Sequence, residues 1–311
     1  MLLVRETLRC PDPDCGETLL PDDRFCEACG LELPPGWADP QPEIVPPLSA
    51  EREDDNHVEV SFPDLAGVSD LGLRRQRNED AMGVARISEP GARIMVVCDG
   101  VSTSARPAAA AQAAANAALD YLVQAVQSGM LDEESAMRGA VDAAQQAVSE
   151  VRFAPDTADD PPATTLVAAL VMDGQATIGW VGDSRAYLVG ADRAWQVSRD
   201  HTWATEQVEL GLIPTDVALS DPRAHALTRW LGGDIAEGFE PSVTTFAVPV
   251  SGCLVLCTDG LWNYAPSPER MCDLVAQFPG DATPVEVAQG LTEFALSSGG
   301  SDNVTVVVAF V

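Results

Sequence analysis

A chain of 311 residues, 46% of them hydrophobic, is long enough for one large globular domain and a small one beside it. Its formal net charge of −30 repels phosphate backbones and anionic lipid, which argues against nucleic acid and membrane surfaces as partners. No apolar run approaches the ~18 residues that a membrane helix needs, and the N-terminal sequence MLLVRETLRC lacks the long apolar core of a signal peptide, so we expect a cytoplasmic protein.

Four cysteines near the N-terminus have the spacing of metal ligands. The pattern is C-x4-C, then ten residues, then C-x2-C, formed by Cys10, Cys15, Cys26 and Cys29. Two such pairs of thiolates are typical ligands of one tetrahedral Zn²⁺, and a segment with so few apolar residues would depend on the metal to fold. We therefore predict a zinc ribbon with one structural Zn²⁺ over residues 1–33. Two disulfides or free thiols are the alternatives, and a cytoplasmic location disfavours disulfides.

Residues 34–60 have the composition of a linker. Prolines and acidic residues replace any apolar periodicity in this stretch. Pro-rich chain is extended, and a run of like charges repels itself, so neither favours a packed core. We expect the main domain to cover residues 61–311.

The main domain begins with a group of basic residues in an otherwise acidic chain. Arg74, Arg75 and Arg77 lie within four positions, and the acidic pair Glu79 and Asp80 follows closely. Guanidinium groups match phosphate oxygens in charge and geometry, so the group predicts a phosphate site. Surface ion pairs with the adjacent acids are the alternative, but they would need no such concentration of arginines.

The next apolar run ends abruptly in an aspartate and a glycine. Residues 94–98 have the length and β-branched content of a buried strand. Asp99 would therefore stand where this strand leaves the core. Gly100 would let a backbone carbonyl approach a cation closely, because it carries no Cβ.

Helices and strands follow in groups. Alanine-rich patterns predict helices over 105–127 and 131–153, and a loop over 156–162 follows them. Four short apolar runs between 164 and 197, separated by turn signals, predict an antiparallel meander. The remaining elements are a short helix with an irregular connection over 200–233, strands over 243–257, helices over 266–278 and 284–297, and a last strand over 303–311. Because strands and helices do not alternate strictly, we predict an α+β sandwich of two sheets.

Four aspartates stand at the ends of predicted strands. Asp99, Asp183 and Asp259 follow strands, and Asp302 precedes the last one. Their negative charges would crowd together unless a cation lay among them, and carboxylate oxygens suit hard ions such as Mg²⁺ or Mn²⁺. We predict a divalent metal site where these strand ends meet.

The order of these motifs resembles that of the metal-dependent serine/threonine protein phosphatases of type 2C, the PPM phosphatases. The resemblance covers residues 67–311 and rests on five ordered stretches: RRQRNEDAM, VVCDGVSTS, ATTLVAALV, WVGDSRAYL, and the pair LCTDGLW and SDNVTVVV. It implies an α+β fold in which a two-sheet antiparallel β-sandwich is flanked by pairs of α-helices. It also implies hydrolysis of phosphoserine and phosphothreonine in proteins by a hydroxide that bridges two divalent ions.

The resemblance further implies the metal ligands. Asp99 would bridge the two ions, and the Gly100 carbonyl would serve the second of them. Asp259 and Asp302 would be the other ligands of the first ion. Asp183 resembles a residue that helps to bind a third, looser ion in bacterial members. The ligand set would thus hold two or three Mg²⁺ or Mn²⁺ ions.

Further residues acquire roles from the same resemblance. Glu79 would reach the second metal through water, and Asp80 would support the ligands from behind. Arg75 would hold the substrate phosphate. Residues 200–233 would form a flap beside the active site. Phosphorylated proteins are the implied substrates, a Ser/Thr kinase system is the implied partner, and we expect a monomer.

One stretch departs from the family pattern. After Gly100, many bacterial members continue with a pair of glycines, whereas this chain has Val101-Ser102-Thr103-Ser104. This departure supports the alternative function, a non-catalytic pseudophosphatase that binds phosphorylated partners. Val101 also cannot donate a proton to the leaving group. His201 and His225 are candidates for that step, and a structural role is the alternative for each.

Overall fold

The computed structural model describes residues 8–10, 12, 15, 18–19, 24–33, 43–45, 56–129, 132–154, 160–233, 240–248 and 252–311. Contacts divide the chain into two units, residues 1–42 and 43–311. Within the described ranges, no helix is long and apolar enough to cross a membrane.

The smaller unit is built from short extended segments. Strand β1 (Leu8–Arg9) pairs antiparallel with β2 (Thr18–Leu19), and Phe25 forms an isolated bridge with Glu32. Its buried apolar residues among those described are Cys10, Leu19, Cys26 and Leu33. Because two of these are themselves cysteines, little apolar surface is left to hold the unit together.

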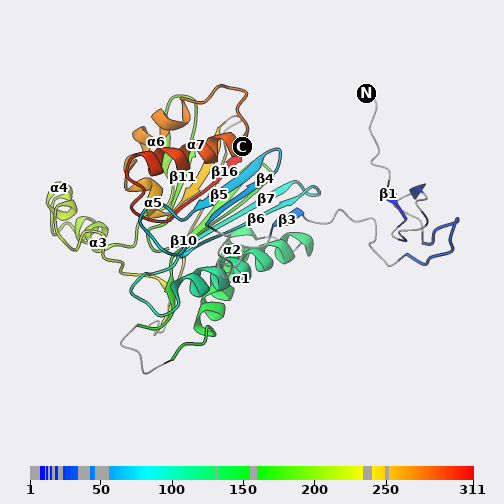
Figure 1. Cartoon of the computed structure of the whole chain (residues 1–311), viewed down its shortest axis with the longest axis horizontal. Coiled ribbons are helices and arrows are strands. Elements are labelled where there is room, and N and C mark those ends of the chain that lie inside the picture. The colour runs from blue at the N-terminus through cyan, green and yellow to red at the C-terminus, as the bar shows by residue number, and fades with distance from the viewer. Residues whose placement is uncertain are drawn as a thin grey trace. The chain divides into compact units, whose positions relative to one another are not determined.

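The larger unit is a sandwich of two six-stranded sheets (Figure 1). The strands of the first sheet, in spatial order, are β14 (Ser242–Ala247), β10 (Gln175–Val181), β9 (Leu166–Met172), β7 (Ala92–Asp99), β6 (Asp80–Ile87) and β3 (Glu43–Val45). Those of the second are β12 (Ala194–Gln196), β11 (Arg185–Val189), β15 (Cys253–Cys257), β16 (Val304–Phe310), β5 (Leu65–Asp70) and β4 (His57–Ser61). All neighbouring strands in both sheets are antiparallel.

Helices cover the outer face of each sheet. Helices α1 (Pro107–Gln127) and α2 (Glu133–Ser149) pack on the first sheet, and α6 (Pro268–Val275) and α7 (Pro284–Ser297) pack on the second (Figure 1). The predicted α+β fold, a two-sheet sandwich flanked by pairs of helices, is therefore confirmed.

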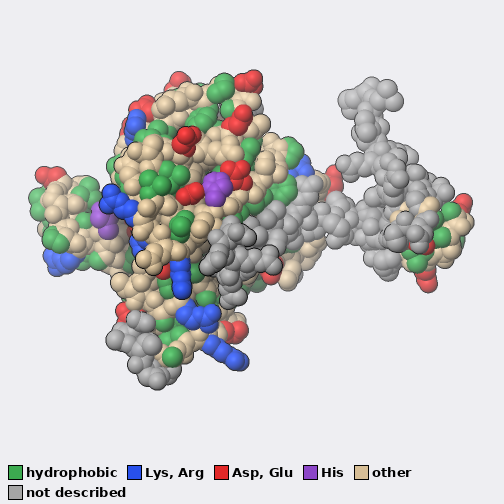
Figure 2. All heavy atoms as spheres, viewed as in Figure 1, with side chains coloured by type: hydrophobic (Ala, Val, Ile, Leu, Met, Phe, Trp, Pro, Cys, Tyr) green, Lys and Arg blue, Asp and Glu red, His purple; other side chains and the backbone are tan. Residues whose placement is uncertain are grey.

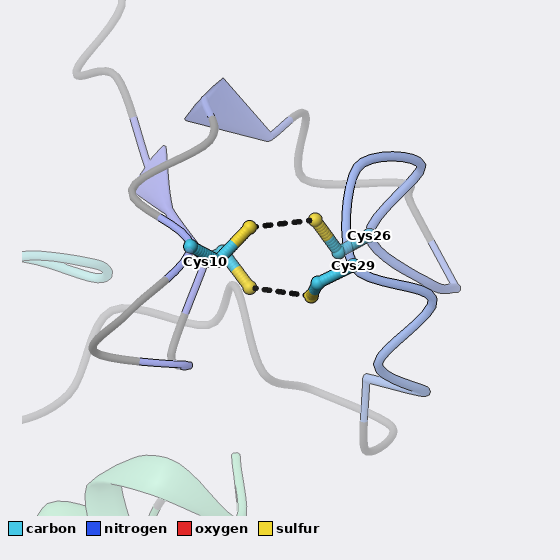
Figure 3. Close-up of side chains that lie close together, drawn as sticks. Cys10, Cys26 and Cys29 are labelled. Carbon is cyan, nitrogen blue, oxygen red and sulfur yellow. Dashed lines mark hydrogen bonds between the residues drawn. The ribbon is translucent and has the colours of Figure 1, made fainter.

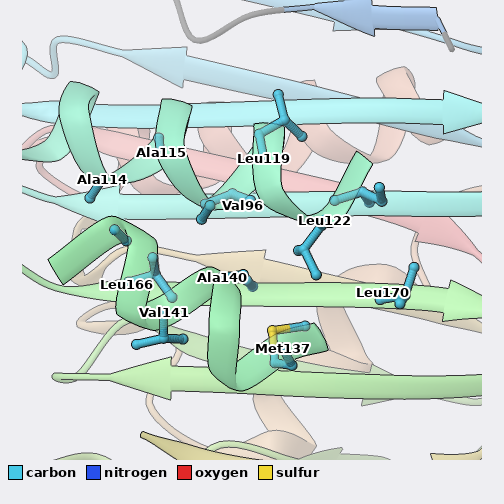
Figure 4. Close-up of a cluster of buried hydrophobic side chains, with 14 of the residues drawn as sticks. Val96, Ala114, Ala115, Leu119, Leu122, Met137, Ala140, Val141, Leu166 and Leu170 are labelled. Carbon is cyan, nitrogen blue, oxygen red and sulfur yellow. The ribbon is translucent and has the colours of Figure 1, made fainter. Parts of the chain in front are cut away.

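Small residues bring α1 and α2 close to the first sheet. Ala114 and Ala140 are fully buried and leave room for larger neighbours such as Leu119, Met137 and Leu166 (Figure 4). Each fully buried leucine of this kind contributes roughly 1.5–3 kcal/mol relative to an exposed one. The alanine-rich pattern therefore marks a helix that packs tightly, in addition to one that forms easily.

A separate apolar layer lies between the two sheets. Along β7, Val96 faces the helices, while its neighbours Met95 and Val97 face the other sheet, as the alternation of a strand requires. Leu256 and Val307 reach this layer from the second sheet. The layer fixes how far apart the two sheets lie.

Several predicted boundaries differ from the structure. The first helix begins at Pro107 instead of Ala105, because Arg106 adopts a left-handed backbone conformation before it. The helix predicted over 266–278 is shorter, Pro268–Val275, whereas the one over 284–297 has the predicted limits. Residues 130–131, at the start of the second predicted helix, and residues 155–159 of the predicted loop lie outside the described residues.

The meander predicted between 164 and 197 is wrong. Strand β10 pairs with β9 and β14, whereas β11 pairs with β12 and β15, so β10 and β11 belong to different sheets. The chain crosses between the sheets at Gly182, whose φ of +99° suits glycine. A Gly-Asp pair is typical both of a hairpin turn and of a connection between two sheets. The sequence pattern therefore could not distinguish the two.

The predicted linker, residues 34–60, is partly built into the sheets. Residues 34–42 and 46–55 lie outside the described residues. Between and after them, β3 and most of β4 are edge strands of the two sheets. Edge strands need few residues and tolerate nearby prolines, so the composition of this stretch hid them.

Acidic side chains are spread over the face of the larger unit that Figure 2 shows. They lie among apolar and uncharged polar groups and do not gather into one patch there. The net charge of −30 is therefore not concentrated into a single binding surface on that face.

Candidate functional site

The predicted aspartates come from strand ends of both sheets. Asp80 begins β6 and pairs in register with Asp99 at the end of β7. Asp259 begins the short helix α5 (Asp259–Trp262) just after β15, and Asp302 precedes the neighbouring antiparallel strand β16. Asp183 lies where the chain crosses from the first sheet to the second. One end of the sandwich thus carries acidic residues from both layers.

The charges of these carboxylates affect one another. Burial, together with the charges of Asp259 and Asp302, raises the pKa of Asp80 to about 8. Burial and the charge of Asp259 raise the pKa of Asp183 to about 8, and burial and the charge of Asp302 raise the pKa of Asp259 to about 6. The pKa of Asp99 is well above its ordinary value, because of burial and then the charges of the other four. Such a group favours a bound cation.

Threonines hold Asp80 from the second sheet. The hydroxyls of Thr258 and Thr305 donate hydrogen bonds of 2.9 and 2.8 Å to the same oxygen of Asp80. Asp80 is buried, and its role as a supporting residue stays a prediction. Sequence reasoning missed both threonines, although each stands at a fixed place beside a motif aspartate or asparagine, in CTDG and in DNVT.

Asp99 is fixed through its backbone. Its N–H donates to Thr165 Oγ1 at 3.1 Å, and its carbonyl accepts from Thr164 Oγ1 at 2.8 Å and from the Thr165 N–H at 2.8 Å. These bonds tie the end of β7 to the chain just before β9. The Asp99 side chain is left to act at the strand end.

Two glycines permit close backbone contacts at this end of the sandwich. A Cβ on Gly100 would lie 2.5 Å from the Pro107 carbonyl oxygen and 2.8 Å from that of Glu79. A Cβ on Gly260 would lie 1.8 Å from the carbonyl oxygen of Asn303. Because only glycine fits there, Asp259 and Asp302, the residues preceding Gly260 and Asn303, are kept close to each other.

Arg75 points into the site, whereas Arg74 and Arg77 are exposed. Its Nη2 donates to Asp302 Oδ2 at 2.5 Å, and its Nη1 donates to the hydroxyl of Ser102 at 3.1 Å. The bond to Asp302 raises the pKa of the Arg75 guanidinium. Of the three arginines that predicted a phosphate site, Arg75 is therefore the one beside the acidic residues.

Asn303 organises the loop that carries Arg75 and Glu79. Its side-chain oxygen accepts from the Glu79 N–H at 2.9 Å, and its Nδ2 donates to the carbonyls of Leu71 and Arg77 at 2.8 and 3.0 Å. Sequence reasoning gave it no role. Its position next to Asp302 was the available signal.

The carboxylates affect one another's pKa values, but their oxygen atoms are not gathered around one position. Among the described residues, the one group of three or more candidate ligands whose donor atoms all lie within 4.8 Å of one another is the four cysteines. Like charges keep the carboxylate oxygens apart, and the Arg75 guanidinium binds Asp302. The donor types fit Mg²⁺ or Mn²⁺. The assignment of Asp99, Gly100, Asp183, Asp259, Asp302 and Glu79 to metal ions stays a prediction.

The four cysteines of the smaller unit are arranged as ligands of one ion. The Sγ atoms of Cys10 and Cys29, and those of Cys15 and Cys26, are each 3.6 Å apart (Figure 3). A tetrahedron with metal–sulfur bonds of about 2.3 Å has edges of about 3.8 Å. A hydrogen bond from the Cys29 backbone N–H lowers the pKa of the Cys26 thiol to about 7, whereas burial raises the pKa of the Cys10 thiol to about 12. None of the four cysteines is in a disulfide.

The histidine considered for proton donation at position 201 has a structural role. His201 Nδ1 accepts from the Gly182 N–H at 3.1 Å, so Nε2 carries the proton and faces Ser242 Oγ, also at 3.1 Å. The ring stacks on Trp180, and burial lowers its pKa to about 4. His225 packs near the ring of Trp262, 5.8 Å between centroids.

A buried ion pair fixes the start of the predicted flap. Arg185 makes a bidentate bond with Asp200, with a shortest N–O distance of 2.6 Å, and its guanidinium lies 3.8 Å above the Trp262 ring. Trp262 Nε1 in turn donates to the carbonyl of Asp183 at 2.9 Å. The first residue of the flap is therefore linked to the crossing point between the sheets.

The predicted flap, residues 200–233, contains two short helices. Helices α3 (Trp203–Glu209) and α4 (Thr215–Leu219) pack on each other and project from the body of the larger unit (Figure 1). The segment returns through β13 (Leu231–Gly232), which pairs with β8 (Ala163–Thr164) close to Asp99. Both ends of the segment thus join the sheet region beside the aspartates.

The family of the chain follows from its match to known proteins. Residues 73–295 match the family described as protein phosphatase 2C. The chain belongs to the protein phosphatase 2C family. The serine/threonine protein phosphatase PstP of Mycobacterium tuberculosis is 33% identical over 245 residues, which cover 78% of this chain and 44% of PstP. The serine/threonine phosphatase stp of Listeria monocytogenes is 32% identical over 244 residues, 77% of this chain and 92% of that protein.

Solved structures agree with this family assignment. The crystal structure of M. tuberculosis PstP/Ppp is 29% identical with a TM-score of 0.59, and the match covers 79% of this chain and 97% of that one. The PstP catalytic domain in complex with two manganese ions is also 29% identical, with a TM-score of 0.58 and coverage of 82% and 99%. The S. agalactiae serine/threonine phosphatase, at 23% identity, shows the fold alone, with a TM-score of 0.66 over 79% of this chain and 98% of that one. The chain spans less than half the length of the full mycobacterial relative.

Proposed function

We propose that the chain is a metal-dependent phosphatase that hydrolyses phosphoserine and phosphothreonine in proteins. The observation that carries the proposal is the meeting of Asp80, Asp99, Asp183, Asp259 and Asp302 at one end of the sandwich, where burial and the neighbouring charges raise the pKa values of the first four. Membership of the protein phosphatase 2C family supports the same reaction class. The relatives PstP and stp are named serine/threonine phosphatases, which supports the substrate class.

The proposed site would hold two divalent ions, Mg²⁺ or Mn²⁺, and a third, looser one. When bound, such ions supply a nucleophile near neutral pH and stabilise the charge that develops on the transferring phosphoryl group. Asp99 with the Gly100 carbonyl, Asp259 and Asp302 would be ligands, Glu79 would act through water, and Asp183 would serve the third ion. The manganese ions in the PstP catalytic domain support this choice of metal.

The remaining residues would bind substrate and shape the site. Arg75 would turn its guanidinium to the phosphate, since a cation on Asp302 competes with the ion pair that Arg75 makes there. Asp80 would hold the ligand end of β7 in place through its pairing with Asp99 and its bonds to Thr258 and Thr305. The Cys10, Cys15, Cys26 and Cys29 cluster would bind one structural Zn²⁺.

The cellular setting belongs to the same proposal. Phosphorylated proteins would be the substrates, and a Ser/Thr kinase system would supply them in the cytoplasm. We expect the protein to act as a monomer. The zinc ribbon would then be a separate unit for docking, because the candidate site is formed within residues 43–311.

The test is hydrolysis of p-nitrophenyl phosphate and of phosphoserine, phosphothreonine and phosphotyrosine peptides. Turnover is expected with Mn²⁺ or Mg²⁺, is expected to vanish with chelator, and should favour the phosphoserine and phosphothreonine peptides. A purified, folded protein without metal-dependent turnover would refute the proposal.

The pseudophosphatase alternative has no observation in its favour among the described residues. Its support was the loss of glycines after Val101. The stretch forms an ordinary turn closed by a bond from the Ser104 N–H to the Val101 carbonyl at 2.8 Å. The turn brings Ser102 to Arg75 and Glu79 instead of removing either from the site.

A further inference from the structure

Ser102 lies between two residues of the candidate site. Its hydroxyl accepts a hydrogen bond from Arg75 Nη1 at 3.1 Å and donates one to Glu79 Oε2 at 2.8 Å. The direction of both bonds is fixed by chemistry, because a guanidinium only donates and a carboxylate only accepts. The single hydroxyl proton therefore points to Glu79, and the oxygen lone pairs face Arg75.

The turn that carries Ser102 is held by hydrogen bonds to Ala163 on both sides. Ser102 and Thr103 are its central residues, between Val101 and Ser104. The Val101 N–H donates to the Ala163 carbonyl at 3.0 Å, and the Ser104 hydroxyl accepts from the Ala163 N–H at 3.2 Å. The hydroxyl of Ser102 is thus presented from a fixed backbone, which is what a positioning group requires.

The two arms of the Arg75 guanidinium have different partners. Nη2 binds the Asp302 carboxylate at 2.5 Å, and Nη1 binds Ser102. Because Nη1 and Nη2 each have their own partner, the plane of the guanidinium is fixed. The orientation of that plane determines how the guanidinium can bind a phosphate. A divalent cation would compete for Asp302 but not for a neutral hydroxyl, so Ser102 is the partner that keeps Arg75 placed when the aspartates hold metal.

We propose that Ser102 is a positioning residue that sets the Arg75 guanidinium for the substrate phosphate and ties it to Glu79. The proposal rests on the proposed phosphatase function and adds to it a residue outside the inferred ligand and phosphate-binding set. Ser102 is exposed and Arg75 is partly exposed, so water competes for these bonds and the effect of losing them is moderate.

The experiment compares wild type with Ser102→Ala, Ser102→Thr and Thr103→Ala. Thr103 is the matched control, because it is exposed on the same turn and its hydroxyl bonds to none of the described residues. Two readouts are taken: kcat and KM for p-nitrophenyl phosphate with Mn²⁺, and the Kd of inorganic phosphate for the Mn²⁺-loaded protein by calorimetry. The second readout does not depend on turnover.

Ser102→Ala is expected to raise KM and the phosphate Kd by about five-fold, or ~1 kcal/mol, with a smaller change in kcat. Ser102→Thr, which keeps the hydroxyl, should have KM and phosphate Kd values close to those of wild type, and Thr103→Ala should match wild type. In an Arg75→Ala background, Ser102→Ala should change the phosphate Kd no further, because the two residues act as one unit.

Contrary results separate this inference from the function on which it rests. A wild-type KM and Kd in Ser102→Ala, or an equally large effect without Arg75, overturns the role of Ser102 and leaves the phosphatase function standing. A wild type that binds phosphate without turning over substrate overturns the function, and the phosphate titration still decides on Ser102. A wild type that binds no phosphate overturns both.

Discussion

The two candidate metal sites of this chain are built in opposite ways. In the smaller unit, the four sulfur atoms already lie within 4.8 Å of one another, but the apolar core around them is minimal. In the larger unit, three large apolar clusters hold the sandwich together. The carboxylates at its end lie close enough for their charges to raise the pKa of Asp99, but their oxygens do not surround a single position. In the first case the candidate ligands are themselves part of the core, and in the second a large separate core positions the candidate ligands.

This difference predicts how each unit responds to loss of metal. A small unit whose buried residues include two of its own candidate ligands has little else to keep it folded. A sandwich with helices on both faces keeps its structure, and removing cations merely leaves buried like charges facing one another. Metal removal should therefore unfold one unit and only destabilise the other.

The largest effect is expected from Cys26→Ser. Loss of one inferred ligand should abolish zinc binding and unfold the smaller unit, because the metal supplies on the order of 10 kcal/mol to such a site. Zinc content and protease sensitivity of the N-terminal segment measure this. Turnover of p-nitrophenyl phosphate should stay within about two-fold of wild type, since the residues inferred for catalysis all belong to the other unit, residues 43–311. Cys272→Ser, a buried cysteine of the larger unit, is the control and should keep its zinc. A fully zinc-loaded Cys26→Ser protein would contradict the ligand assignment.

Asp99→Asn tests the other site. Metal-dependent turnover should fall on the order of a thousand-fold, because the inferred bridging ligand is lost. Thermal unfolding in chelator should not occur earlier than in wild type, since Asn is uncharged and replaces a carboxyl group whose ionisation burial and the neighbouring charges disfavour. Asp173→Asn makes the same chemical change on an exposed turn with a left-handed backbone, which Asn tolerates, and should have no effect on turnover. Turnover near the wild-type level in Asp99→Asn would remove the basis of the proposed mechanism.

The buried ion pair of the flap should matter for stability. Both side chains of Arg185 and Asp200 are 10% exposed, so Asp200→Ala leaves a buried guanidinium without its partner and should cost ~3 kcal/mol of unfolding free energy. Asp221→Ala breaks the pair with Arg223, which is 63% exposed, and should cost much less, because water screens exposed charges. Urea denaturation of the two variants gives both values. Equal costs would show that burial of the first pair is unimportant.

The smallest expected effect is the change in unfolding free energy per pH unit in the metal-free protein. Asp80 and Asp183 have pKa values of about 8 in the folded state, compared with 3.8 ordinarily. Between these values the folded chain holds protons that the unfolded chain has lost, so stability is greatest at low pH and falls as pH rises toward 8. Each group contributes at most ~1.4 kcal/mol per pH unit. Urea denaturation in chelator at pH 5.5, 6.5 and 7.5 measures the slope, and Asp80→Asn should reduce it. Stability that rises with pH in chelator would contradict the shared burial of these carboxylates.

Much of the fold could be predicted because its signals are local. The strand that ends at Asp99 and the helix over 284–297 follow from length, residue type and flanking turns. The crossing at Gly182 could not be predicted, because sheet membership depends on partners far along the chain: β11 pairs with β15, and β10 with β14. Local patterns do not encode that choice.

The same limit applies to the candidate site. Aspartates at strand ends are visible in the sequence, and the structure brings them to one end of the sandwich. The residues that hold these aspartates in place cannot be recognised from the sequence, because their partners are far away along the chain. The bond from Thr305 to Asp80 spans 225 positions, and that from Glu79 to Asn303 spans 224. Ser102 was noticed as a departure from a pattern, and only its contacts with Arg75 and Glu79 give it a role.

The apolar layer between the sheets has one more consequence. Asp99 ends a strand of one sheet, whereas Asp259 follows and Asp302 precedes a strand of the other. Apolar side chains between the sheets, such as Met95, Leu256 and Val307, therefore set the distance between the two halves of the acidic cluster. Substitutions that shorten these apolar side chains would let the two halves of the acidic cluster shift relative to each other. The dimensions of the candidate site thus depend on apolar side chains in the middle of the sandwich.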